Sequence, residues 1–199
     1  VALQNGCICC TLKMDLVEQI NEILKMERFD YIVIEASGIC EPEPIARTIC
    51  SIPSMNGEYT RNGIAGIDCI VTVVDAVRMQ SEFSCGDDLI RKNIDDEDIE
   101  NLLIQQIEFC NIVLLNKAAD VQPNELQRIK EIIKNLQPGV EIIESNYADV
   151  ALEKIINTRK FNYNKTATSA GWIQGIEGET EEEEHGEHKH HEHEHHDHD

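Results

Sequence analysis

The chain opens with a cysteine cluster whose spacing suits a soft metal ion. Cys7, Cys9 and Cys10 place three thiols within four residues, directly before a segment with helical periodicity. The positive end of a helix favours thiolate over thiol and so lowers the pKa of a nearby cysteine. Thiolates bind zinc or copper(I), and tetrahedral zinc takes four ligands, so three thiolates leave one position open. The alternative is a structural turn in which the cysteines are incidental.

The other metal-binding pattern is the acidic end of the chain, where imidazoles alternate with carboxylates. Such a stretch binds zinc, nickel or copper loosely and at several points. The alternatives are a solubilising acidic tail or an affinity tag, although a tag is usually a plain run of histidines. The rest of the chain has no histidine, so histidine-based catalysis is excluded there. The tail contains all eight histidines, which are His185, His188, His190, His191, His193, His195, His196 and His198.

Two apolar runs end in residues that could bind a nucleotide. Tyr31–Ile34 is followed by Glu35 and, three residues later, by Gly38. In phosphate-binding α/β proteins a magnesium-associated carboxylate and a glycine that senses the γ-phosphate occupy such positions, at the carboxyl end of a strand. A strand, an acid and a turn also follow one another by chance, so this pattern alone leaves both interpretations open.

The second run, Asn111–Leu115, is followed by Asn116 and Lys117, and then by Asp120. In GTP-binding proteins such an asparagine helps to hold guanine, the lysine packs over the base, and an aspartate accepts hydrogen bonds from guanine but not from adenine. The alternative is a plain strand, turn and helix in which the aspartate caps the helix.

The elements that must position these residues alternate along the chain. Apolar runs without polar alternation predict buried parallel strands, and apolar residues at helical spacing predict helices between them. Alternating strands and helices predict an α/β fold with a doubly wound, mostly parallel sheet of right-handed crossovers. The predicted strands are Tyr31–Ile34, Ile67–Val74, Asn111–Leu115 and Val140–Ile143, and the clearest helices are those of Ile99–Ile107 and Pro123–Leu136.

Composition limits the classes of partner. The chain has 199 residues, is 41% hydrophobic and has a formal net charge of -21, so it has enough apolar residues for a core but no excess of basic ones. We expect no binding to nucleic acid, which would require a basic face. No apolar run approaches the roughly 20 residues that span a bilayer, so we expect no membrane association. An apolar core, thiols outside any disulfide framework and no leader predict a cytoplasmic protein.

Taken together, the order of these motifs resembles the CobW-type metallochaperone GTPases, relatives of UreG and HypB among the P-loop proteins. The segments that carry the resemblance are LQNGCICCTL at 3–12, DYIVIEASGICEP at 30–42, VVDAV at 73–77, QQIEFCNIVLLNK at 105–117 and SAGWI at 169–173. The resemblance implies a partial GTPase domain at 1–158, a connecting segment at 159–177 and a disordered metal-binding segment at 178–199.

The resemblance also implies a function: binding and hydrolysis of GTP coupled to delivery of zinc, or of Ni²⁺, Co²⁺ or Cu⁺, to a client metalloprotein, with Mg²⁺ as the nucleotide's companion ion. A homodimer is one expected assembly. Cys7, Cys9 and Cys10 match the family's metal motif, and the histidines would collect or buffer the metal. Glu35 and Gly38 match its Walker B and switch positions. Asn116 and Lys117 match its base-recognition motif.

Two departures qualify these expectations. The family's glycine-rich phosphate loop and the strand before it belong upstream of the cysteines, and this sequence does not contain them. We therefore expect an internal piece of a longer protein, one that does not hydrolyse GTP efficiently by itself. In the base motif the acid stands one position late, because Ala119 occupies its usual place. Either Asp120 reaches the base through a shifted turn, or selectivity for guanine is weakened.

Two other functions compete with the GTPase metallochaperone. One is a non-catalytic buffer that stores zinc or nickel on the cysteines and histidines. The other is a regulatory relative that binds a partner through its acidic tail.

Overall fold

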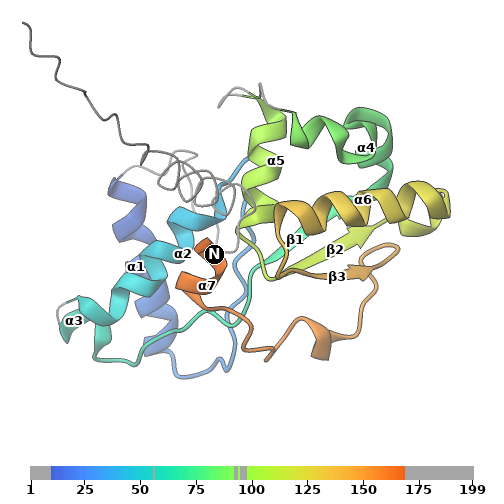
Figure 1. Cartoon of the computed structure of the whole chain (residues 1–199). Helices are drawn as coiled ribbons and strands as arrows, with labels where there is room; N and C mark the ends of the chain where they lie inside the picture. Colours follow the sequence, from blue (N-terminus) through green and yellow to red (C-terminus); the bar gives the residue numbers. More distant parts are fainter. Residues whose placement is uncertain (1–9, 56, 92–93, 95–97, 169–199) are drawn as a thin grey trace, which may run out of the picture.

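A parallel sheet with helices around it forms the centre of the computed structural model, which describes residues 10–55, 57–91, 94 and 98–168 (Figure 1). Its strands are β1 (Val71–Asp75), β2 (Ile112–Asn116) and β3 (Glu141–Glu144). The α-helices are α1 (Cys10–Lys25), α2 (Pro42–Ser51), α3 (Gly57–Thr60), α4 (Ala76–Glu82), α5 (Ile99–Glu108), α6 (Pro123–Leu136) and α7 (Tyr163–Thr168). Short 3₁₀ helices are η1 (Ile52–Ser54), η2 (Ser84–Ile90), η3 (Ala118–Asp120) and η4 (Leu152–Lys154).

The sheet order in the described chain is β1-β2-β3, and both neighbouring pairs are parallel. In the first pair Val71 lies opposite Ile112, and Asp75 lies opposite Asn116. The carboxyl ends of β1 and β2 therefore coincide, and their last polar residues are neighbours. This arrangement confirms the α/β class and the parallel sheet predicted from the apolar runs.

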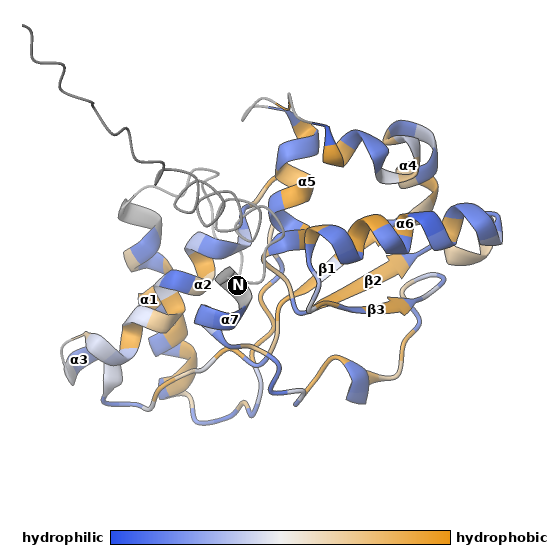
Figure 2. Ribbon diagram, viewed as in Figure 1, coloured by the Kyte–Doolittle hydropathy of each residue, from blue (hydrophilic) through white to orange (hydrophobic). Residues whose placement is uncertain are grey.

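The core lies on both faces of β2. On one face, Val113 and Leu115 pack with Met79 of α4 and with Ile129 and Ile133 of α6. On the other face, Ile112 and Leu114 pack with Ile143, and Val150 and Ile155 from the chain after β3 lie against them. Figure 2 shows the resulting hydrophobic strands and the amphipathic α6. Burial on two faces explains why β2 is apolar without alternation.

A smaller cluster joins α1 to α2. Val17 and Ile20 of α1 are buried against Ile49 of α2 and Ile52 of η1. Figure 1 shows α1 and α2 to the left of the sheet and α4, α5 and α6 above it. In the described ranges no helix is long and apolar enough to cross a bilayer.

The predicted strand at Tyr31–Ile34 is wrong. Residues 31–37 are extended but belong to no strand, and Val33 and Ile34 are 79% and 41% exposed. A strand requires a ladder of backbone hydrogen bonds to a neighbour, and the described sheet has only three strands, none of which pairs with this segment. An apolar run predicts burial but does not reveal whether a partner strand lies beside it.

The predicted strand at Ile67–Val74 is too long at its start. β1 begins at Val71. Before it, the carbonyl of Asp68 accepts from the backbone N–H of Phe161, and the N–H of Ile70 donates to Asn111 Oδ1. The backbone groups of residues 67–70 therefore form part of their hydrogen bonds with the Asn111 side chain and with Phe161, and not within a strand ladder. The helix predicted to open at Pro123 and to close before Gly139 is confirmed as α6, which ends at Leu136.

Candidate functional site

The carboxyl edge of the sheet brings Asn116 and Lys117 to one place. Asn116 is the last residue of β2, and Lys117 follows it in the left-handed conformation, with φ 59° and ψ 31°. This conformation is uncommon for a residue other than glycine, and it costs about 1–3 kcal/mol. It turns the chain sharply into η3, so two adjacent side chains reach different neighbours.

Asn116 reaches the loop that follows β3. Its Oδ1 accepts a hydrogen bond from the backbone N–H of Ala148 at 2.9 Å and from Ser145 Oγ at 3.4 Å. A reciprocal bond runs the other way, because Asn146 Oδ1 accepts from the N–H of Ala119 at 3.0 Å. The loop after β2 and the loop after β3 thus hold each other through two asparagine side chains. This crossed pair of bonds fixes both loops at the carboxyl edge of the sheet.

Lys117 reaches the end of β1 instead. Its Nζ lies 2.6 Å from Asp75 Oδ2, and the two side chains are 50% and 26% exposed. Burial by itself would raise the pKa of Asp75, but hydrogen bonds from Lys117 and from the backbone N–H groups of Arg78 and Val77 outweigh it and lower the pKa. Asp75 is therefore ionised at neutral pH and is a stable partner for the ammonium.

Asp120 lies at the end of η3, where its backbone N–H donates to the carbonyl of Lys117 at 3.1 Å. Its side chain is exposed. Ala119, in the position that an aspartate would usually take, has its N–H bound by Asn146. A contact of Asp120 with a base therefore stays a prediction.

The turn at residues 37–40 presents the other two predicted residues. Glu35 and Gly38 are both exposed, and a Cβ built at Gly38 would meet no atom within 4 Å. The N–H of Cys40 closes the turn on the carbonyl of Ser37 at 3.0 Å. The Glu35 side chain and the turn at Gly38 are therefore both open to solvent, and their contact with a phosphate or its cation stays a prediction.

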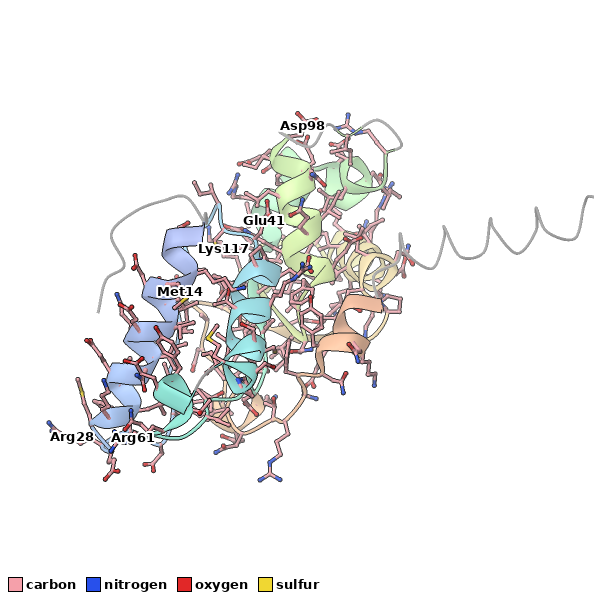
Figure 3. All side chains as sticks on the ribbon, turned by 90° about the vertical axis from the view of Figure 1, so that its left-hand side faces the viewer. Met14, Arg28, Glu41, Arg61, Asp98 and Lys117 are labelled. Atoms are coloured by element: carbon pink, nitrogen blue, oxygen red, sulfur yellow. The ribbon has the colours of Figure 1, made fainter. Side chains whose placement is uncertain are left out.

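Two hydrogen bonds tie this turn to α5. Gln106 Nε2 donates to the carbonyl oxygens of Gly38 at 3.0 Å and of Cys40 at 3.2 Å. The carbonyl of Gln106 itself accepts from Thr72 Oγ1 of β1 at 2.7 Å. In Figure 3, Arg28 near the start of the extended segment lies low, and Glu41 beyond its end lies near the height of Lys117. Similar height in this view does not bring them together. Thr72 is the second residue of β1, so the turn lies beside the amino-terminal half of that strand, and none of the described hydrogen bonds joins it to Asn116 or Lys117 at the carboxyl edge.

The predicted metal ligands are mostly outside the described residues. This applies to Cys7, Cys9 and all eight histidines, whereas Cys10 is the first residue of α1. The sequence predicts a helix directly after the cysteine cluster, whereas α1 already includes the last cysteine of the cluster. Among the described residues, no group of three or more His, Cys, Asp or Glu side chains could hold a metal ion.

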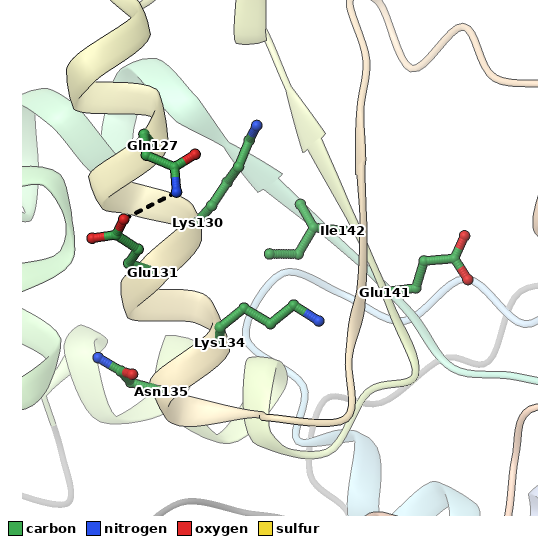
Figure 4. A pocket seen from close by; sticks show the side chains of 7 residues that line it. All are labelled: Gln127, Lys130, Glu131, Lys134, Asn135, Glu141 and Ile142. Atoms are coloured by element: carbon green, nitrogen blue, oxygen red, sulfur yellow. Dashed lines mark hydrogen bonds between the residues drawn. The ribbon is translucent and has the colours of Figure 1, made fainter.

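A hollow of about 480 Å³ lies elsewhere, between α6 and the edge strand β3 (Figure 4). Its polar side chains already have structural partners: Lys130 pairs with Glu144, and Lys134 Nζ donates to the carbonyl of Val140. None of the predicted site residues lines it. We therefore place the candidate site at the carboxyl edge of the sheet.

Sequence reasoning missed four residues of this edge: Asp75, Ser145, Asn146 and Ala148. The signal for Asp75 was available, since an acid ends the apolar run before α4, in the strand neighbouring Asn116. The other three follow β3 directly, at the same edge of a parallel sheet. Ligand-binding residues of α/β proteins collect at that edge.

Comparison with known proteins identifies the family of the chain. The family model described as the CobW/HypB/UreG nucleotide-binding domain matches residues 1–144. Zinc-regulated GTPase metalloprotein activator 1 of Dictyostelium discoideum is 35% identical over 188 residues, which cover 89% of this chain and 38% of the relative. Its namesake in Schizosaccharomyces pombe is 31% identical over 74% of this chain and 31% of the relative.

The zinc chaperone CobW of Sinorhizobium sp is 30% identical over 161 residues, or 76% of this chain and 44% of the relative. The chain thus spans less than half the length of these curated relatives. No solved structure matches the chain. Because the family model covers most of the sequence, from the cysteine cluster to the end of β3, the chain belongs to the CobW/HypB/UreG family of nucleotide-binding domains.

Proposed function

We propose that this chain is part of a GTP-dependent metallochaperone that binds zinc and delivers it to a client metalloprotein. The observation that carries the proposal is the position of Asn116 and Lys117 at the carboxyl end of β2, the central strand of the described sheet. The Asn116 side chain bonds to the loop after β3, and the Lys117 side chain bonds to the end of β1. Relatives named as zinc-regulated GTPase activators and zinc chaperones support both the nucleotide and the metal.

The described residues suit one half of the task, recognition of a nucleotide. Asn116 and Lys117 would hold the base, with Asp120 as the acid nearest in sequence to the usual position. Glu35 would stand near a nucleotide-bound Mg²⁺, which stabilises the charge that develops on the phosphates when it is bound. Gly38, in an open turn, would follow the γ-phosphate. Hydrolysis of GTP belongs to the protein in its full natural length.

Zinc is the cargo in this proposal. Cys7, Cys9 and Cys10 would hold it through thiolates, and the open fourth position would let a client ligand enter. The histidines at 185–198 would raise the local concentration of metal. Cys10 is the first residue of α1, and α1 packs on α2, which begins two residues after the turn that contains Gly38. A shift of that turn with nucleotide state would therefore reach the metal site through packed helices.

The test uses the natural full-length protein. GTP turnover is measured with and without stoichiometric zinc, in the wild type and in Cys9→Ser, with Cys50→Ser as a matched control because Cys50 is an exposed cysteine of α2 that is not part of the cysteine cluster in the sequence. We expect zinc to change turnover in the wild type and in the control but not in Cys9→Ser. Turnover that is indifferent to zinc in the wild type would contradict the coupling.

A non-catalytic metal buffer is the second candidate, and the histidine-rich tail favours it. A buffer takes up zinc to the same extent with and without GTP, and Lys117→Ala leaves its uptake unchanged. Equilibrium dialysis of zinc with and without a non-hydrolysable GTP analogue separates the two functions. We expect the analogue to change zinc affinity.

A further inference from the structure

The Asp75 carboxylate has two different tasks at the end of β1. Its Oδ1 accepts from the backbone N–H groups of Val77 at 3.0 Å and Arg78 at 3.2 Å, and so caps α4. Its Oδ2 accepts from Lys117 Nζ at 2.6 Å. One oxygen therefore belongs to the fold, and the other belongs to the loop after β2.

The second task follows from the sheet register. Asp75 lies directly opposite Asn116, so the residue after Asn116 emerges beside the end of β1. The left-handed conformation of Lys117 sends its side chain toward β1, whereas the Asn116 side chain binds the loop after β3. Without the carboxylate, the half-exposed lysine would have no charged anchor at this edge among the contacts that the structure describes.

We propose that Asp75 is a positioning residue of the base site, which holds Lys117 in the conformation that packs on a guanine base. This inference rests on the proposed function, because the base site is part of it. A long lysine side chain loses rotamer freedom when it is ordered, and a partner that orders it in advance spares the ligand that cost. Asp75 acts through Lys117 and not on the nucleotide.

The competing explanation is that Asp75 only caps α4. Asparagine separates the two tasks, because its amide oxygen caps a helix about as well as a carboxylate does but has no charge for the lysine. Asp75→Asn therefore keeps the first task and removes the second. Asp87→Asn is the matched control, since Asp87 is a similarly exposed aspartate paired with Arg128 on α6 and distant in the chain from both strand ends.

The experiment measures binding of GDP to the natural full-length protein by titration calorimetry. We expect Asp75→Asn to weaken GDP binding about fivefold, which is the upper range for an exposed ion pair. Asp87→Asn should change it by less than about twofold. In a Lys117→Met background, Asp75→Asn should have no further effect, because the group that Asp75 positions is already gone. Loss of affinity through a damaged α4 would persist in that background.

A second readout needs no nucleotide. Acetylation of lysines by a limiting amount of acetic anhydride, which transfers an acetyl group to the neutral amine and releases acetate, followed by peptide mass spectrometry, reports how accessible each lysine amine is. We expect Lys117 in Asp75→Asn to react about threefold faster than in the wild type, with Lys130 unchanged because its partner Glu144 is intact.

The two readouts distinguish failure of this inference from failure of the proposed function. If the wild type binds no GDP, the proposed function fails, and Lys117 labelling alone decides whether Asp75 positions it. Three results would each overturn the inference. The first is unchanged labelling of Lys117 in Asp75→Asn, and the second is unchanged GDP affinity in that variant. The third is a loss of affinity on Asp75→Asn that is as large in the Lys117→Met background as in the wild type.

Discussion

Replacing Gln106 by alanine should free the turn that contains Gly38. The Gln106 amide donates to the carbonyl oxygens of Gly38 and Cys40, at 3.0 and 3.2 Å. The backbone of Gln106 is fixed separately, because its carbonyl accepts from Thr72 Oγ1 at 2.7 Å. The substitution therefore removes both contacts to the turn and leaves α5 attached to β1.

The size of the effect follows from the exposure of these two bonds. A neutral hydrogen bond contributes a net 0.5–1.5 kcal/mol, and bonds at the surface lie at the lower end, so the pair contributes about 1.4 kcal/mol. That free energy is about a tenfold change in the equilibrium between closed and open turn. Alanine is also a better helix former than glutamine by a few tenths of a kcal/mol, so α5 should not weaken. The whole-chain free energy of unfolding should fall by less than about 1 kcal/mol.

Amide hydrogen exchange is the direct assay. The N–H of Cys40 donates to the carbonyl of Ser37 within the turn, so its exchange rate reports opening of the turn. We expect about tenfold faster exchange at Cys40 in Gln106→Ala, with peptides of α6 unchanged. Gln105→Ala is the matched control, because it makes the same change one residue earlier in α5.

Two results would refute this reasoning. Unchanged exchange at Cys40 would mean that the Gln106 bonds do not restrain the turn. A similar increase in α6 would mean that the substitution loosens the whole fold, and the local effect would then be an artefact of lower global stability.

Three further predictions test other contacts. Gly86→Ala should lower the free energy of unfolding by about 2–4 kcal/mol in urea titrations, because its φ is 100° and the new Cβ would lie 2.8 Å from Ile132 Cγ2. Asn116→Ala should weaken GDP binding in the full-length protein at least tenfold, since it releases the N–H of Ala148 and removes an amide from the base site. The phenol of Tyr31 should contribute stability that is present below pH 10 and is lost as pH rises toward 12. Burial and its hydrogen bond to Asp68 raise its pKa to about 12, so this loss should be absent from thermal melts of Tyr31→Phe.

Hydrophobic periodicity and helix-terminus signals were enough to predict α6 and β2. The helix α6 was predicted from its observed start, because Pro123 opens it and its apolar residues recur at helical spacing up to Leu136. β2 was predicted to within one residue, because a strand covered on both faces is apolar throughout. The extended segment at 31–37 was not, since strand formation there depends on a neighbouring backbone that the run itself does not specify.

The residues of the candidate site also divide into those that the local sequence identifies and those that only the fold brings together. Asn116 and Lys117 were identified because both stand together after an apolar strand. Asp75 and Asn146 were missed because they approach this pair only through the sheet order, and Asp75 is 42 positions from Lys117 in the sequence. A local pattern predicts which residues end a strand, whereas the register decides which strand ends meet.

The backbone conformation of Lys117 is one that favours glycine over lysine. A position with φ 59° favours glycine, which would relieve about 1 kcal/mol of strain or more. Glycine would satisfy the turn, because the N–H of Ala118 would still donate to the carbonyl of Ser145 and close the two loops together. The chain instead has a lysine whose ammonium reaches Asp75. The ion pair with Asp75 offsets part of the strain, and the proposed role of Lys117 in the base site would explain why a lysine stands there.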